Sequence, residues 1–141
     1  MGIVQSNKLT KEERLTSKVL IEKLFRQGKS IFSFPIKLVY LPLDEGQDDA
    51  PAYLFGVTVP KRLHRKAHER NLLKRRIREA YRKNKPPIIK RNGKVLRFAF
   101  MYICVDRNIS DYDLIVKAIK KLHKKIHSKS FSPLNARDDS K

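Results

Sequence analysis

The sequence of 141 residues carries 33 Lys and Arg against 14 Asp and Glu, a formal net charge of +19. Such an excess repels itself in a compact chain and is typical of proteins that bind a polyanion, with nucleic acid ahead of an anionic membrane. Hydrophobic residues make up 40% of the chain, which excludes a wholly disordered basic tail. The length fits one domain with a modest core, and no apolar run approaches the roughly 20 residues of a membrane-spanning helix.

The N-terminal segment and the single cysteine indicate a cytoplasmic protein. The stretch MGIVQSNKLTKEE has no continuous apolar region of the kind that directs export. Gly2 and Ser6 match the short myristoylation pattern, which often arises by chance, and no membrane partner is predicted. Cys104 lies in the apolar stretch RFAFMYICV and is expected to be a buried side chain in a reducing compartment. Residues 1–13 are predicted to be flexible.

A short helix is predicted over residues 17–27. Ser17 suits the N-cap and Gly28 suits the C′ position. An earlier start is the alternative, because Thr10 and Glu13 form a capping-box pattern. The apolar stripe of this helix consists of Leu20, Ile21, Leu24 and Phe25.

Extended structure follows in the stretch SIFSFPIKLVYL, which Pro35 interrupts. Beyond this break Ile36, Leu38 and Tyr40 share one face of a strand. Pro42–Pro51 is predicted to be a turn-rich loop. Its four carboxylates belong to Asp44, Glu45, Asp48 and Asp49. A solvated loop is preferred to a metal or acid/base site, because nothing anchors those side chains.

The next strand is AYLFGVTVPK, which Pro60 ends and which carries Tyr53, Phe55, Val57 and Val59 on one face. A basic segment follows from Lys61 to Lys83 and consists of a helix and the loop that leads into it. The Pro- and Gly-containing stretch NKPPIIKRNGK is predicted to be a loop. Residues 95–105 are almost all apolar, which favours a central strand buried on both faces.

The last helix is predicted to begin after Ser110 as its cap, with Asp111 and Asp113 at its positive end. Lysines crowd its negative end. Its apolar face is formed by Leu114, Ile115, Ala118, Ile119, Leu122 and Ile126. Residues 131–141 are predicted to be a disordered tail, which leaves residues 14–130 as one domain.

This order of elements predicts an α+β fold, an α/β two-layer sandwich in which a sheet of about four strands packs with three helices in the order αβββαβα. The basic helix lies between two strands and is therefore a candidate βαβ crossover.

The strongest functional signal is the basic segment. Residues 61–83 contain eleven Lys or Arg against two Glu. On a helix Leu73, Ile77 and Tyr81 stack on one side, while Arg70, Lys74, Arg78 and Arg82 form a neighbouring ridge that Arg75 and Arg76 extend. Like charges four residues apart destabilise a free helix, so such crowding indicates that phosphates neutralise it. A solvated helix face normally mixes both signs, and nucleic-acid binding is therefore predicted.

Aromatic residues in and beside the predicted strands favour single-stranded RNA, whose bases can stack on them, although most of these rings are expected to be core. Two histidine pairs with a spacing of four, His64 with His68 and His123 with His127, are conceivable metal or acid/base groups. Surface histidines in a phosphate-binding region are the preferred interpretation, because no third ligand is near in sequence. No catalytic or metal-binding residue is predicted in this chain.

The stretch FGVTVPKRLHRKAHERNLLKRRIREAYR, residues 55–82, resembles the protein component of bacterial ribonuclease P. The matching positions are Lys61, Arg62, Arg70, Asn71, Lys74, Arg75, Arg78 and Glu79. The earlier stretch RLTSKVLIEKLFRQGKS resembles the opening helix of the family, with Arg14, Leu15, Phe25 and Gly28 in register. The chain departs from the family pattern at Leu72 and His64, which replace Arg and Gly, and at Ile21 and Val39, which stand where aromatic residues are usual.

The resemblance implies a division of labour between protein and RNA. A large RNA subunit would hold the active site with its Mg²⁺ ions and hydrolyse one phosphodiester to mature the 5′ end of tRNA. The protein would bind this RNA through Lys61, Arg62, Arg70, Asn71, Lys74, Arg75 and Arg78. It would hold the 5′ leader of precursor tRNA in a cleft between the first helix and the sheet, at Ile21, Phe25, Val39 and Tyr40. No protein partner is predicted. The alternatives are a non-catalytic protein that binds structured or ribosomal RNA, and a metal-dependent nuclease acting alone.

Overall fold

A computed structural model describes residues 8–43 and 51–131 of the chain. The myristoylation pattern, the four carboxylates of the predicted acidic loop, and the predicted tail beyond residue 131 lie outside the described residues. The helical elements are the 3₁₀-helix η1 (Lys11–Glu13) and the α-helices α1 (Lys18–Gln27), α2 (Ala67–Lys83) and α3 (Tyr112–Phe131). The strands are β1 (Lys29–Ser33), β2 (Ile36–Leu43), β3 (Tyr53–Thr58), β4 (Lys90–Arg91), β5 (Lys94–Val95) and β6 (Arg97–Cys104).

Four strands form one mixed sheet in the order β1-β2-β6-β3. The pairs β1–β2 and β2–β6 are antiparallel, whereas β3 and β6 are parallel. The connection from β3 to β6 contains α2, so the basic helix lies in a βαβ crossover as predicted. The main elements follow the order αβββαβα, which confirms the predicted α+β fold class.

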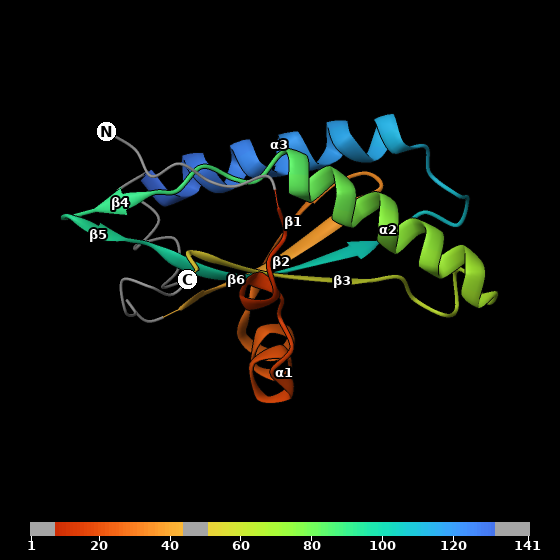
Figure 1. The fold of residues 1–141 in the computed structure, drawn as a ribbon, viewed down its shortest axis with the longest axis horizontal. Coiled ribbons are helices and arrows are strands. Elements are labelled where there is room, and N and C mark those ends of the chain that lie inside the picture. The colour runs from red at the N-terminus through yellow and green to blue at the C-terminus, as the bar shows by residue number, and fades with distance from the viewer. Residues whose placement is uncertain (1–7, 44–50, 132–141) are drawn as a thin grey trace.

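The sheet carries apolar side chains on both faces. Figure 1 shows α2 and α3 together on one side of the sheet and the short α1 on the other. The larger core lies beneath α2 and α3 and includes Phe100 and Tyr102 of β6. The smaller core lies beneath α1 and includes Ala99 and Met101 of the same strand. The central strand β6 is therefore buried on both faces, as its apolar sequence predicts.

The predicted start of α1 is confirmed and its end differs in detail. The Ser17 hydroxyl accepts a hydrogen bond from the Leu20 amide at 3.2 Å. The Thr10–Glu13 capping box also forms, but it caps the separate helix η1 within the segment predicted to be flexible. Gly28 has an extended backbone (φ −70°, ψ 157°) rather than the left-handed conformation of the predicted C′ position. A Cβ atom at Gly28 would lie only 2.9 Å from Val39 Cγ1, so glycine is needed for close approach of α1 to β2.

The remaining differences concern element ends. Strand β2 continues to Leu43, into the segment predicted as a loop, because its register with β6 extends to the pair Leu43–Arg97. The predicted loop before β6 contains the two-stranded ribbon β4–β5, turned by Asn92 and Gly93, which both have positive φ.

The start of α3 also differs from the prediction. The helix begins at Tyr112, and the Ser110 hydroxyl donates to the Asp106 carboxylate at 2.8 Å rather than capping it. Leu114, predicted on the apolar face of this helix, is exposed.

Candidate nucleic-acid interface

Helix α2 is attached to the sheet by a buried apolar row. Leu73, Ile77 and Ala80 are fully buried in the larger core, and Tyr81 is almost so. The Tyr81 ring stacks on the Phe55 ring of β3 with centroids 4.4 Å apart. This row fixes the rotation of the helix about its axis, so the basic residues on its other side face outward, as the spacing predicts.

The predicted RNA-binding residues other than Arg70 occupy that outward side and the lead-in to the helix. Lys61, Arg62, Asn71 and Arg75 are exposed, and Lys74 and Arg78 are half-buried. Arg75 is followed by Arg78 after three residues, and Lys74 precedes Arg78 by four. These spacings place the three side chains on adjoining turns of one helix face.

Arg70 has an internal contact that the sequence does not predict. Its Nη1 donates to the backbone carbonyls of His64 and Arg65, both at 2.8 Å. Arg70 therefore folds the lead-in loop back onto the first turn of α2. Arg76 acts similarly at the other side of the helix, where its Nη1 donates to the Ser110 carbonyl at 2.6 Å.

Two further side chains on this side of α2 form polar contacts within the protein. Arg82 donates to both carboxylate oxygens of Glu79, at 3.0 and 2.6 Å, and this hydrogen bonding lowers the pKa of Glu79. His64, predicted as a surface histidine, is only 2% exposed, and its Nε2 lies 2.7 Å from the Asp106 carbonyl oxygen. The ridge of α2 thus has internally bonded arginines near both ends and its outward cations between them.

The predicted cleft residues do not all lie on one surface. Ile21 and Val39 pack in the smaller core beneath α1, and Phe25 lies at the end of α1 with half of its side chain exposed. Tyr40 points to the opposite face of the sheet, where its ring contacts Phe98 edge-to-face. The structure therefore separates Tyr40 from the other three, because successive residues of β2 alternate between the two faces.

One row of side chains on the α1 side of the sheet was missed by the sequence reasoning. Phe32 of β1 pairs with Lys37 of β2, which pairs with Ile103 of β6, which in turn pairs with Thr58 of β3. Phe32 is 51% exposed and Lys37 is exposed as well. The alternation that places Ile36 and Leu38 on the α2 side also places Lys37 on the α1 side. The period of the strand could therefore have predicted the position of Lys37.

The prediction of surface histidines is wrong for His123 of α3. His123 is buried, its Nε2 lies 2.7 Å from the Tyr102 hydroxyl, and burial lowers its pKa to about 4. Among residues 8–43 and 51–131, no group of three or more His, Cys, Asp or Glu side chains is placed to hold a metal ion. None of the described helices is both long and apolar enough to cross a membrane.

A helix that is apolar toward a mixed sheet and densely cationic toward solvent defines a small nucleic-acid-binding protein of the α+β class. Residues 9–129 match the Ribonuclease P protein family. The chain is 32% identical over 117 residues to the ribonuclease P protein component of Porphyromonas gingivalis, covering 80% of this chain and 82% of that protein. It is 31% identical to the protein component of Chlorobium phaeobacteroides, over 86% and 90% of the two chains. The chain belongs to the ribonuclease P protein family.

Solved structures agree with this assignment. The ribonuclease P protein of Thermotoga maritima superposes with a TM-score of 0.62 at 25% identity and covers 80% of this chain and 96% of its own. The Staphylococcus aureus protein superposes with a TM-score of 0.62 at 18% identity, over 81% and 94% of the two chains, which shows the shared fold.

Proposed function

We propose that this chain is the protein subunit of a ribonuclease P ribonucleoprotein, in which it binds the large catalytic RNA and the 5′ leader of precursor tRNA. The observation that carries the proposal is the outward basic face of α2, held in one orientation by a buried apolar row in a chain of this family. Exposed Arg and Lys side chains there are suited to phosphate oxygens, and the Arg guanidinium matches them with two parallel hydrogen bonds. The large RNA would lie against this face.

The leader would lie on the other side of the sheet. Phe25 at the end of α1 and Phe32 on β1 are each about half exposed. Lys37, paired directly with Phe32, adds a cation next to that ring. Exposed rings beside a cation are the arrangement that binds single-stranded RNA, because the rings stack on bases and the cation contacts phosphate. Val39 would line the floor of this surface, whereas Tyr40 faces the larger core and is not part of it.

The chemistry would belong to the RNA. Hydrolysis of a phosphodiester in this class of enzyme requires Mg²⁺, which neutralises charge on the reacting phosphate. The described part of the chain offers no cluster of ligands that fits such an ion. We propose that Mg²⁺ lies at phosphates of the RNA subunit and that the protein binds and orients both RNAs.

Reconstitution tests the proposal against the two alternatives. The purified protein alone should not cleave precursor tRNA, and its cognate large RNA should restore 5′ processing when both are present at low Mg²⁺. Metal-dependent cleavage by protein free of RNA would instead indicate a nuclease acting alone. Tight binding to structured RNA without any stimulation of 5′ processing would indicate a non-catalytic RNA-binding protein.

A further inference from the structure

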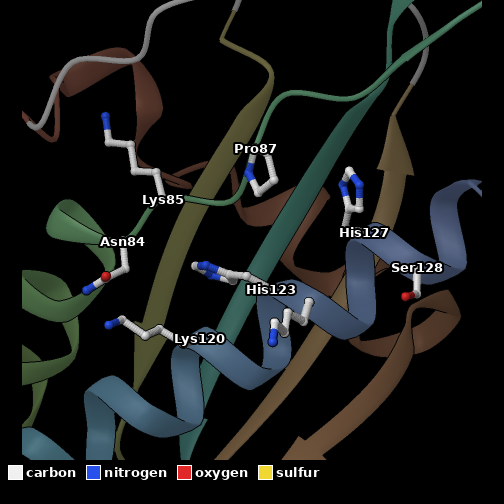
Figure 2. A pocket seen from close by; sticks show the side chains of 8 residues that line it. Asn84, Lys85, Pro87, Lys120, His123, His127 and Ser128 are labelled. Atoms are coloured by element: carbon white, nitrogen blue, oxygen red, sulfur yellow. The ribbon is translucent and has the colours of Figure 1, made fainter.

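A cavity of about 560 Å³ lies between the linker that follows α2 and the C-terminal half of α3. The linker contributes Asn84, Lys85 and Pro87, and α3 contributes residues from Lys120 to Ser128. Figure 2 shows Lys120 and His123 extending from α3 toward Asn84. None of the α2 cations proposed to bind the large RNA and none of the residues of the α1 surface lines the cavity, so neither part of the proposed function uses it.

The floor of this cavity is fixed by hydrogen bonds within the protein. The buried His123 imidazole bonds the Tyr102 hydroxyl of β6 and also the backbone of Asn84, which ties α3 to the sheet and to the linker. Asn84 in turn donates from Nδ2 to the Ala80 carbonyl at 2.9 Å. Lys85 forms an ion pair with Glu13 at 2.7 Å. Because these groups are already engaged, the cavity is formed before any ligand arrives.

The rim of the cavity is cationic. The sequence of α3 repeats as KKLH followed by KKIH, residues 120–127. This period of four places Lys120 and Lys124 one above the other on a row of the helix, with His123 and His127 on the next row. Both lysines are exposed at the cavity, and His127 is half-buried beside them. Two ammonium groups one helical turn apart have a spacing comparable to that of adjacent phosphates along a single strand.

We propose that this cavity takes one unstacked nucleotide of the large RNA subunit, an inference that rests on the proposed function. The volume is suited to a nucleobase with its ribose. His123 and His127 line the cavity, and imidazole rings are among the side chains on which unstacked RNA bases stack. The ring of Pro87 offers a second apolar surface. The flanking phosphates lie on Lys120 and Lys124. An acidic peptide would use the lysines but not the ring surfaces.

The position of the cavity favours the large RNA, rather than the leader, as its ligand. α3 packs with α2 on the same side of the sheet, and the cavity lies at the C-terminal end of α2. The surface proposed for the leader is on the opposite side, with α1. An RNA bound along the basic face of α2 can therefore reach the cavity without passing around an edge of the sheet.

A pair of double variants tests the cationic rim. Lys120→Ala with Lys124→Ala removes both rim charges, and Lys117→Ala with Lys121→Ala removes two exposed charges of the same helix outside the cavity. The measurement is the Kd of the full-length protein for the transcribed large RNA, at one salt concentration. The rim variant should raise Kd at least about fivefold, because two cations that contact phosphates are lost. The control should change it clearly less, and equal losses in the two variants would overturn the proposal.

A second pair tests occupancy without changing charge. Ser128→Leu places an apolar side chain at the cavity, whereas Ser128→Ala removes only the hydroxyl. We expect Ser128→Leu to weaken binding of the large RNA and Ser128→Ala to leave it unchanged, with both proteins unfolding at the wild-type temperature. Wild-type affinity in Ser128→Leu would overturn the proposal. Wild-type protein must bind the RNA and support 5′ processing in the same assays, so a failure of the proposed function is distinguished from a failure at the cavity.

Discussion

Neighbouring arginines of α2 have different structural surroundings. Arg75 is exposed on the outward face, whereas Arg70 donates to two carbonyls of the lead-in loop and Arg76 donates to the carbonyl before α3. The helical spacing predicts which side of α2 is basic. It does not predict which guanidinium finds a carbonyl, because that depends on loops that are remote in sequence or irregular in conformation.

This difference predicts that two alanine substitutions affect different properties, RNA binding in one case and fold stability in the other. Arg75→Ala should weaken RNA binding and lower the salt-dependence slope by about one unit or less, since it removes one phosphate contact. Arg70→Ala should lower the free energy of unfolding by about 1–2 kcal/mol, because two carbonyls lose a charged donor. Binding titrations at several salt concentrations and urea unfolding measure both quantities. If Arg75→Ala unfolds at a lower urea concentration than wild type while its RNA affinity is unchanged, the outward face is assigned incorrectly.

Phe25 provides the test of the leader surface. Phe25→Ala should weaken binding of precursor tRNA by the holoenzyme more than binding of mature tRNA, because only the precursor has a leader to stack on the ring. The expected loss is roughly 1–3 kcal/mol of binding free energy. Val19→Ala is the control, since Val19 is an exposed apolar residue of the same helix. If the ratio of the two dissociation constants stays at its wild-type value while the fold is destabilised, Phe25 is a core residue.

At the scale of elements, the sequence predicts best where a periodic pattern is long. The eight-residue strand β6 and the stripes of α2 and α3 are predicted because burial repeats along them. The ribbon β4–β5 has only two residues in each strand, which is too short for any period to be visible. Its turn, Asn92-Gly93, is a recognised hairpin signal that the flanking prolines and charges obscured.

The junction of α1 and β2 depends on one glycine. Gly28→Ala should lower the free energy of unfolding by about 1–3 kcal/mol, because the added Cβ would meet the Leu24 carbonyl oxygen and the Val39 side chain. Urea unfolding checks this, with the exposed neighbour Gln27→Ala as control. A stability equal to wild type would show that α1 can move away from the sheet without loss. Since α1 carries Phe25, the same variant should also weaken discrimination between precursor and mature tRNA.

At the scale of the whole molecule, the sheet separates two surfaces. The basic face of α2 could be predicted from the sequence because charge and helical period coincide in one segment. The surface beneath α1 could be predicted only in part. Pairing of Phe32 with Lys37 and the inward direction of Tyr40 follow from strand register, and register is set by contacts between segments that are remote in the chain.

Stability of the whole molecule should depend on pH through His123. Burial lowers its pKa to about 4 in the folded protein, from an ordinary value of 6.5. The unfolded chain therefore binds a proton first as the pH falls, and stability declines from near neutrality toward pH 4. Between pH 7 and about pH 5 the loss should be about 2 kcal/mol. Urea unfolding of wild type and His123→Gln at both pH values measures it, and an equal pH dependence in the two proteins would contradict this role.

The central position of β6 has a consequence for synthesis of the protein. Both neighbours of β6 precede it in the chain, and the pair Ile36–Cys104 closes a loop of almost half the sequence. Contacts of such separation form slowly, because the entropy of closing the loop is lost before the contacts form. A nascent chain emerging from the ribosome therefore holds β2 and β3 with unpaired edges, and its basic α2 without a complete sheet, until β6 is released. During that interval the chain is prone to aggregate and to bind nearby RNA through charge alone.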